Sequence, residues 1–234
     1  MNSLIISPHL DDAVLSLGAV IAKLGRSGGN VTIATVLAGC DDSLISPLIG
    51  SGSIVTLRRI EDEEACALLG AHCVHLDILD AAFRTYGSEK NFCYDTWPLL
   101  FAGKNFNDGT VSTMIDDEFR ALEKMRFSEV YIPLGIGHID HRIVSESARR
   151  HFHGIKQYSY AEYPYFEKVK SRSVFDDFKV ADVSPLDIRL KARAILKYES
   201  QIKLVFGQDY QESELFEKLM NTPELISEGA NHAS

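Results

Sequence analysis

The sequence predicts an α/β protein of the doubly wound class, with a mostly parallel sheet and helices on both faces. Short apolar runs alternate with stretches of helical apolar spacing across the first two thirds of the chain, and this alternation with right-handed crossovers produces a parallel sheet. The runs are continuously apolar, which is typical of strands buried on both faces. A length of 234 residues with 45% hydrophobic residues fits one globular domain that folds without disulfides or a structural metal.

The first predicted unit is a strand, a turn and a helix. Residues 3–7 form a short run with β-branched side chains that stops at Pro8, and residues 12–24 carry apolar side chains at helical spacing before Gly25. The same signals predict further elements in alternation, at 31–37 (strand), 53–69 (helix), 73–79 (strand), 110–125 (helix), 129–134 (strand) and 139–152 (helix).

The last third of the sequence carries weaker signals. We expect strands at 156–162 and 173–183 and one long helix over 185–205. We therefore assign one domain to residues 1–220 and expect the tail, 221–234, to fray.

The charge and composition of the chain exclude several classes of function. Lys and Arg number 24 against 33 Asp and Glu, so the net charge is −9 and the pI is near 5.4. Such a surface repels polyphosphate, and we expect no nucleic-acid partner. No apolar stretch approaches the roughly 18 residues of a membrane helix, and no basic leader precedes the first apolar run. The four cysteines lack CxxC spacing, which favours reduced thiols in a cytoplasmic protein.

Ligands of doubly wound proteins bind beside the carboxyl ends of the strands. Two long, turn-rich segments, 38–52 and 84–109, begin at this edge of the predicted sheet. They exceed the usual connection of about 4–6 residues, and loops of this kind are commonly lids or binding walls. We expect them to shape substrate choice, with surface insertions of no function as an equally weighted alternative.

Polar side chains gather where the first strand ends, in Ser7-Pro8-His9-Leu10-Asp11-Asp12. His9 and Asp12 would point to opposite faces of a straight strand, so they can share one atom only if the chain turns between them. A strand-to-helix turn does this, and it places Asp12 near the positive end of a helix dipole. The alternative is structural, with Asp12 as the N-cap of the helix and Asp11 as a solvated turn residue.

A second polar cluster follows the fourth strand and contains His138, Asp140 and His141. Two histidines three residues apart at a helix start project on neighbouring lines, but an isolated HxxH pattern is a weak metal signal. Two polar clusters at strand ends of one sheet are stronger evidence. Two histidine nitrogens and one carboxylate, with an open position for water, form the ligand pattern of a catalytic zinc.

These motifs resemble those of the PIG-L, or LmbE-like, family of zinc-dependent N-acetylglucosaminyl de-N-acetylases. Its members carry His-Pro-Asp-Asp and His-Pro-Asp-His, which residues 8–12 and 138–141 resemble. Further matches lie in the second helix and in the C-terminal helix, at Arg58, Glu61, Ala65, Leu69, Gly70, Lys191, Ser200 and Gln201. The resemblance spans about positions 4 to 205 and implies a single-domain Rossmann-like fold.

The resemblance also implies a role for each motif residue. The implied ligands of Zn²⁺ are His9, Asp12 and His141. Asp11 would be the general base for the attacking water, His138 would bind or protonate the reacting amide, and Asp140 would orient it. The substrate would be an N-acetylglucosamine-type amino-sugar conjugate that yields acetate and a free amine, with Arg58 as a substrate contact. Whether Asp11 or His138 gives the amine its proton stays open, as does the homo-oligomeric state that some family members adopt.

The chain departs from the family motifs at three positions. Leu10 and Ile139 replace prolines, and Ala13 replaces a common acidic residue. None of the three is an expected ligand, so the departures concern the rigidity of the turns. For Arg58, an ion pair with Glu61 or Asp62 on an exposed helix surface is an alternative to the substrate contact.

Other functions compete with amide hydrolysis. His9, Asp11 and His141 also match the 2-His-1-carboxylate triad of mononuclear iron enzymes, although those enzymes generally use an antiparallel jelly roll. A non-catalytic zinc- or sugar-binding protein is a further alternative, in which Asp11 would be dispensable.

Three remaining features carry weaker signals. His72 and His75 face opposite ways on a predicted strand, so we expect no shared metal. The aromatic alternation over 158–165 is typical of a half-buried strand, with sugar stacking as the alternative. The Gly135-Ile136-Gly137 segment lacks the third glycine and the acidic partner of a dinucleotide fingerprint, so we expect no NAD.

Overall fold

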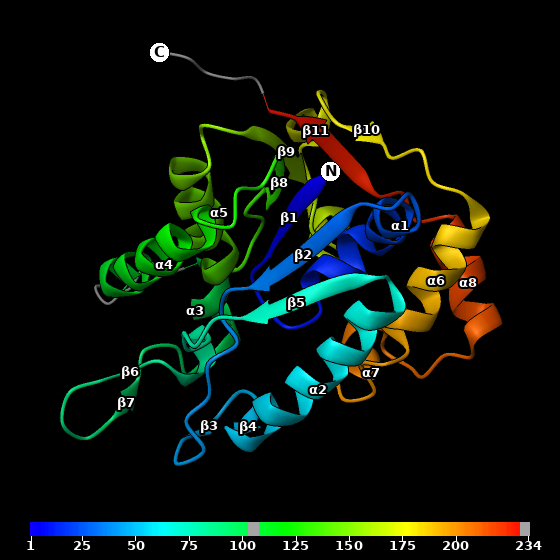
Figure 1. Cartoon of the computed structure of the whole chain (residues 1–234). Helices are drawn as coiled ribbons and strands as arrows, with labels where there is room; N and C mark the ends of the chain where they lie inside the picture. Colours follow the sequence, from blue (N-terminus) through cyan, green and yellow to red (C-terminus); the bar gives the residue numbers. More distant parts are fainter. Residues whose placement is uncertain (103–107, 230–234) are drawn as a thin grey trace.

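The computed structural model describes residues 1–102 and 108–229, which form a seven-stranded sheet in the order β10-β11-β9-β8-β1-β2-β5 (Figure 1). The parallel strands are β1 (Asn2–Ser7), β2 (Asn30–Thr35), β5 (Ala71–His75), β8 (Glu129–Pro133) and β9 (Lys156–Tyr160). Two antiparallel strands extend the sheet beyond β9, namely β11 (Leu225–Glu228) and β10 (Lys179–Val180).

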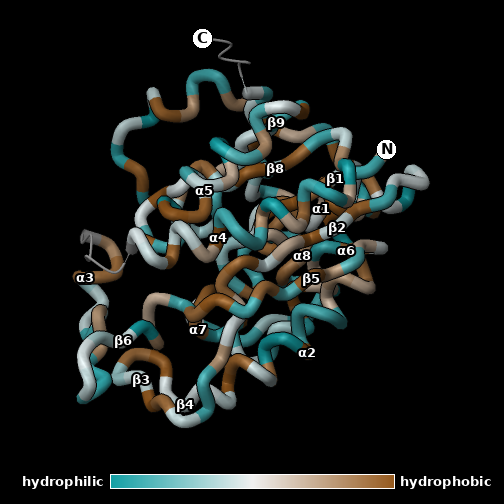
Figure 2. The backbone as a smooth tube through the Cα atoms, turned by 60° about the vertical axis from the view of Figure 1, so that its left-hand side comes forward, coloured by the Kyte–Doolittle hydropathy of each residue, from teal (hydrophilic) through white to brown (hydrophobic). Residues whose placement is uncertain are grey.

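Helices cover both faces of this sheet (Figure 1). One face carries α1 (Asp12–Arg26), α2 (Ser53–Leu68), α6 (Pro185–Ile195), α7 (Ile202–Phe206) and α8 (Glu212–Met220), and the other carries α4 (Asp108–Glu123) and α5 (Ile139–His151). In β1, Ile5 packs into the first hydrophobic cluster, whereas Leu4 and Ile6 pack into the second. Figure 2 shows hydrophobic residues along β8 and hydrophilic ones along the outer α2. The predicted fold class is confirmed.

The order of the strands determines where a ligand can bind. From β1 the chain adds β2 and β5 on one side, and it then returns to add β8 and β9 on the other side. The carboxyl ends of β1 and β8 are therefore adjacent at a point where the winding direction reverses. Such a switch point opens a crevice between the two connections, which is the usual ligand site of this architecture.

The long helix predicted over 185–205 is wrong, because the chain leaves the helix after α6 and starts α7 only at Ile202. Side chains of α2 hold the intervening segment. The Glu61 carboxylate accepts hydrogen bonds from Ser200 N (2.8 Å) and Ser200 Oγ (2.6 Å), and Asp62 accepts one from Tyr198 Oη (2.6 Å). These tertiary hydrogen bonds override the helical spacing of the sequence.

Two other predictions for the last third are also wrong. The expected strand 173–183 begins within a short 3₁₀ helix, Arg172–Phe175, which is followed by a turn, and only the two residues of β10 are assigned as strand. The tail expected to fray from 221 instead forms β11, which pairs with both β9 and β10. The sheet thus continues beyond the predicted domain boundary at 220, and residues 230–234 lie outside the described residues.

Both long loops begin at the carboxyl edge of the sheet and contain small elements. The first holds the hairpin β3 (Ile45–Ser46) and β4 (Gly50–Ser51). The second holds the hairpin β6 (Thr85–Tyr86) and β7 (Asn91–Phe92), then α3 (Trp97–Ala102), and its residues 103–107 are outside the described ranges. Among the helices of the described ranges, none has the length and apolarity to cross a membrane.

Candidate active site

The turn after β1 brings His9 and Asp12 together. Ser7 Oγ donates to His9 O (2.8 Å) and accepts from Ala13 N (3.0 Å), which closes the turn between strand and helix. Asp12 begins α1, and its Oδ2 accepts a hydrogen bond from His9 N (2.9 Å). Neither Asp11 nor Asp12 caps the helix with its side chain, so the N-cap alternative is wrong.

Asp11 occupies a strained position in this turn. Its φ is 125°, in a region that residues with a Cβ rarely adopt. Its side chain is not solvated, because the residue is only 8% exposed, which contradicts the alternative of an exposed turn residue. Residues with strained backbone conformations occur preferentially at functional sites, and Asp11 lies where the winding direction of the sheet reverses.

The turn after β8 positions the second cluster. Gly135 (φ 91°) and Gly137 (φ 74°) adopt the left-handed conformation that only glycine takes without strain. A Cβ at Gly135 would also lie 3.1 Å from the Ser145 side chain. The chain then enters α5 with His138 at its N-cap and His141 in the first turn, both buried.

His9, Asp12 and His141 converge on one point. Asp12 Oδ2 lies 3.2 Å from His9 Nδ1 and 3.2 Å from His141 Nε2, and the ligand atoms of the trio all lie within 4.8 Å of one another. His141 Nε2 is buried without a hydrogen-bond partner among the described residues. Two imidazoles and one carboxylate at this separation fit the protein ligands of a catalytic zinc.

The pKa shifts of Asp12 and His141 show that their charged forms are favoured in the site. Burial would raise the pKa of Asp12, but His141 and the hydrogen bond from His9 hold it well below its usual range. Burial would lower the pKa of His141, yet Asp12 and Glu162 raise it to about 9. Without a metal, protons on the imidazoles therefore balance the buried carboxylates, and a divalent cation would release them on binding.

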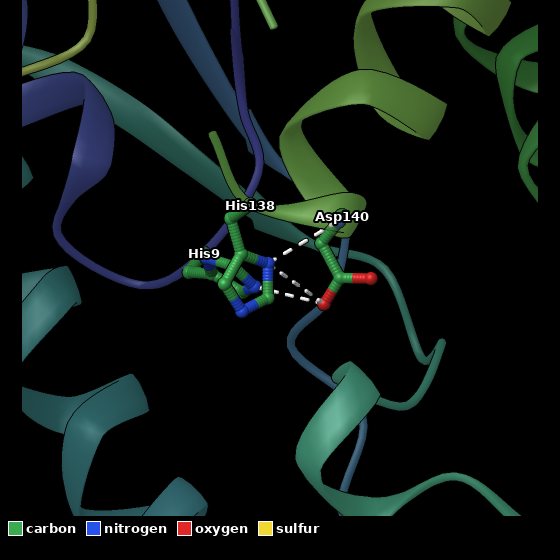
Figure 3. Close-up of side chains that lie close together, drawn as sticks. All are labelled: His9, His138 and Asp140. Carbon is green, nitrogen blue, oxygen red and sulfur yellow. Dashed lines mark hydrogen bonds and ion pairs between the residues drawn. The ribbon is translucent and has the colours of Figure 1, made fainter. Parts of the chain in front are cut away.

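A second group of side chains, His9, His138 and Asp140, also has the spacing of metal ligands (Figure 3). Its carboxylate is already engaged, because Asp140 accepts a hydrogen bond from Ala81 N (2.9 Å) and forms an ion pair with Arg84. Asp140 Oδ2 also lies 3.0 Å from His9 Nε2, the ring nitrogen that faces away from Asp12. Asp140 thus lies on the Nε2 side of the His9 ring, and Nδ1 is the ring nitrogen that faces Asp12.

Asp11 is not part of either group of candidate metal ligands among the described residues. Its Oδ2 lies 3.6 Å from Arg58 Nη2, which also donates to Leu10 O (2.9 Å). Burial raises the pKa of Asp11 to about 7, with Arg58 opposing the shift and Asp12 adding to it. The triad of His9, Asp11 and His141 expected for a mononuclear iron site is therefore not assembled among the described residues, and Asp11 is a buried carboxylate outside both candidate ligand groups.

The pKa of His138 is shifted in the opposite direction from those of His9 and His141. Burial lowers its pKa to about 4, so the ring is neutral near pH 7. Its Nδ1 accepts a hydrogen bond from Asp140 N (3.2 Å), which puts the proton of the neutral ring on Nε2. Figure 3 shows that Nε2 faces away from Asp140, and Phe101 packs against the ring with centroids 5.5 Å apart.

Arg58, His72 and His75 are three further positions singled out in the sequence. The Arg58 side chain is 12% exposed and contacts the turn after β1, so the alternative of an exposed arginine paired with Glu61 or Asp62 is wrong. His72 is exposed, whereas His75 Nε2 lies 2.8 Å from Asp62, and neither belongs to a candidate metal group of the described residues.

Three site residues were missed in the sequence. Asp80 and Arg84 follow β5, with Asp80 Oδ2 3.6 Å from His9 Nε2. Glu162 follows β9, and its Oε1 lies 3.3 Å from His141 Nδ1. The rule that ligands bind at strand ends would have found Asp80, and Glu162 is the one acidic residue of the aromatic run over 158–165.

The raised pKa of Asp11 has a consequence for stability. The pKa is 3.8 ordinarily and about 7 in the fold, so protonated Asp11 favours folding, and this contribution is lost as the pH rises from about 4 to 7. We expect metal-free Asp11→Asn to gain stability relative to the wild type over this range. Urea unfolding of both proteins with a chelator, from about pH 4 to pH 8, measures the difference. A difference independent of pH would contradict the assignment.

The chain is similar in sequence to two known deacetylases. Two relatives are named 2'-N-acetylparomamine deacetylase. The protein from Niallia circulans is 24% identical over 233 residues, covering 87% of this chain and 82% of its own. That from Streptomyces fradiae is 28% identical over 152 residues, covering 63% of this chain and 51% of its own.

The fold is also shared with a solved deacetylase. The zinc-inhibited form of teicoplanin deacetylase Orf2 superposes with a TM-score of 0.80 at 24% identity, covering 97% of each chain. The sequence pattern of the PIG-L family, described as GlcNAc-PI de-N-acetylase, matches residues 4–152. This match spans more than half of the chain and contains both polar clusters, so the chain belongs to the PIG-L family.

Proposed function

We propose that this protein is a zinc-dependent hydrolase that removes the N-acetyl group from an N-acetylglucosamine-type amino-sugar conjugate, releasing acetate and a free amine. The observation that carries the proposal is the convergence of His9, Asp12 and His141 beside Asp11, a buried carboxylate outside the ligand trio. Membership of a family described as de-N-acetylases supports it, as do relatives named for deacetylation of an acetylated amino sugar.

The three converging side chains would hold the zinc ion through His9 Nδ1, Asp12 Oδ2 and His141 Nε2. When bound, zinc acts as a Lewis acid on a carbonyl oxygen and lowers the pKa of water to about 7. Behind the ligands, Asp140 faces His9 Nε2, which keeps the proton of that ring away from the metal side.

Proton transfer falls to Asp11 in this proposal. A general base works best with a pKa near the operating pH, and burial brings the pKa of Asp11 to about 7. Asp11 would take a proton from the attacking water and return it to the leaving amine. Arg58, 3.6 Å away, fixes the direction of the carboxylate and is a candidate contact for the sugar.

His138 serves as a neutral hydrogen-bond donor. Its low pKa makes it a poor proton reservoir near pH 7, but its Nε2–H can donate to the oxyanion that forms when water attacks the acetamide. In this proposal Asp11 rather than His138 moves the proton, and the low pKa of His138 supports that division.

Replacement of His138 tests this assignment. We expect His138→Phe to lower kcat by about 10²–10³ with little change in KM, the usual cost of losing one oxyanion donor. Because the pKa of His138 is about 4, its ring is neutral over the tested pH range, and the variant should keep the shape of the wild-type pH profile. Steady-state kinetics of both proteins from about pH 5 to pH 9 measure both quantities. Loss of the alkaline limb in the variant would instead assign His138 as the general acid.

The activity itself is tested by amine release. The zinc-loaded protein should release free amine and acetate from at least one member of a panel of soluble N-acetylglucosaminides, and a chelator should abolish the release until zinc is restored. The His138 and Asp11 variants serve as controls for contaminating deacetylases. Absence of amine release from the whole panel, by protein shown to contain zinc, would contradict the proposal. The cytoplasmic location and the absence of a nucleic-acid partner stay predictions.

A further inference from the structure

Glu162 is a buried carboxylate that the proposed chemistry does not use. β9 pairs in parallel with β8 (Figure 1). Glu162 follows the end of β9 and is 0% exposed. Burying a carboxylate is costly unless charges or several hydrogen bonds compensate. The hydrogen-bond partners of Glu162 therefore show which groups this carboxylate holds in place.

Four donors converge on the two oxygens of Glu162. Oε1 accepts from Gly135 N (2.7 Å) and Ile136 N (3.1 Å), and Oε2 accepts from Leu134 N (3.2 Å). Oε1 also lies 3.3 Å from His141 Nδ1. One side chain thus holds the backbone of the turn that leads into α5 and the imidazole that α5 presents to the site.

The contact with His141 selects a tautomer. A carboxylate oxygen accepts, so Nδ1 of His141 is the nitrogen that donates to Glu162. In the neutral ring that a metal requires, the proton therefore stays on Nδ1 and Nε2 has the lone pair. Nε2 is the buried nitrogen without a hydrogen-bond partner among the described residues, 3.2 Å from Asp12 Oδ2. The lone pair therefore points to the place where His9 and Asp12 converge.

We propose that Glu162 is a positioning residue for the metal centre, which fixes the tautomer and orientation of His141 and thereby sets the affinity for Zn²⁺. His9 has an equivalent partner in Asp140, 3.0 Å from its Nε2. Each imidazole ligand is then backed by its own carboxylate, an arrangement that raises the basicity of the ligand nitrogen. The inference rests on the proposed function only through the metal, not through the amide substrate.

Glu162→Gln separates this role from a purely structural one. The amide has the same shape, and its one oxygen can still accept from Gly135 N and Ile136 N, but it loses the hydrogen bond from Leu134 N and the charge that holds Nδ1–H of His141. We expect the Kd for Zn²⁺, measured by competition with a chromogenic chelator, to rise by about 10–100-fold. Co²⁺ substituted for zinc should also show an altered d–d spectrum, because His141 is no longer held in one orientation.

Glu224 provides a matched control. It is also buried, and it accepts from Ala19 N (2.9 Å), Val20 N (2.9 Å) and Lys191 Nζ (2.7 Å), away from both polar clusters. We expect Glu224→Gln to lower the Tm of the metal-free protein with no change in zinc affinity. If Glu162→Gln behaves in the same way, with a lower Tm and a zinc Kd equal to that of the wild type, Glu162 only holds the turn and the inference is overturned.

A measurement on the wild type covers the case in which Glu162→Gln does not fold. NMR of the zinc-loaded protein with ¹⁵N-labelled histidine should show His141 with a proton on Nδ1 and the metal on Nε2. A metal on Nδ1, or no proton there, would overturn the inference. None of these readouts needs a substrate, so a Glu162-dependent zinc affinity in a protein that releases no amine would contradict the proposed activity and leave this inference intact.

Discussion

Asp11→Asn is expected to keep the zinc ion and lose the reaction. Asparagine has the size of the original residue, and it tolerates the unusual backbone of this position better than most residues, where φ is 125°. It cannot take a proton from water. Because general acid–base catalysis contributes about 10²–10⁴-fold to a rate, we expect kcat to fall by that factor with a zinc content equal to that of the wild type.

The measurement pairs metal analysis with amine release on the same preparation. Asp116, an acidic residue of α4 that pairs with Arg150 on the protein surface, provides the control as Asp116→Asn, which should change neither quantity. An Asp11→Asn protein with wild-type turnover would refute the role of general base. One that has lost its zinc would instead make Asp11 a ligand.

Asp12→Ala is expected to lose the metal together with the activity. Asp12 Oδ2 is the atom shared by the two imidazoles, at 3.2 Å from each. Without it, two imidazoles face each other across a site that has lost its only ligand charge. Replacing a residue that hydrogen-bonds to a metal ligand typically lowers the metal affinity by about 10–100-fold. Removing a ligand itself should lower it further.

Asp62→Ala separates this effect from general destabilisation. Asp62 is equally buried and bonds Tyr198 Oη and His75, at 2.6 Å and 2.8 Å, but it does not contact the ligand trio. We expect both variants to be less stable than the wild type, and only Asp12→Ala to bind no zinc by metal analysis after dialysis. Stoichiometric zinc in Asp12→Ala would move the metal centre elsewhere.

The parallel part of the fold follows from sequence patterns that are local. The runs predicted at 3–7 and 129–134 and the helix predicted at 139–152 agree with β1, β8 and α5 to within a few residues. Strands buried on both faces need continuous apolar side chains, and the helices between them need one apolar stripe. Both patterns can therefore be recognised in the sequence itself.

The C-terminal third depends on contacts that no local pattern contains. The break between α6 and α7 is held by Glu61, a residue 139 positions before Ser200. β11 is a four-residue strand whose stability comes from β9 and β10 on either side. Both features are set by distant partners, and helical spacing or polarity in the sequence was misleading for that reason.

The candidate site divides in the same way. The two polar clusters could be brought together in prediction because each comes directly after a predicted strand of one sheet. The choice of His9, Asp12 and His141 within them came from the resemblance to the PIG-L family. Arg84 and Glu162 could not be predicted, since their positions depend on which strands are neighbours and on side chains reaching across loops. The strand order β9-β8-β1 decides that Glu162 meets His141.

A crystal structure of the zinc-loaded protein, with anomalous diffraction at the zinc edge, tests the metal centre most directly. We expect one peak bound by His9 Nδ1, Asp12 and His141 Nε2 at about 2.0–2.2 Å, with the Asp11 carboxylate outside the coordination sphere. A peak held by His9 Nε2, His138 and Asp140, or no zinc at the ends of β1 and β8, would contradict this expectation.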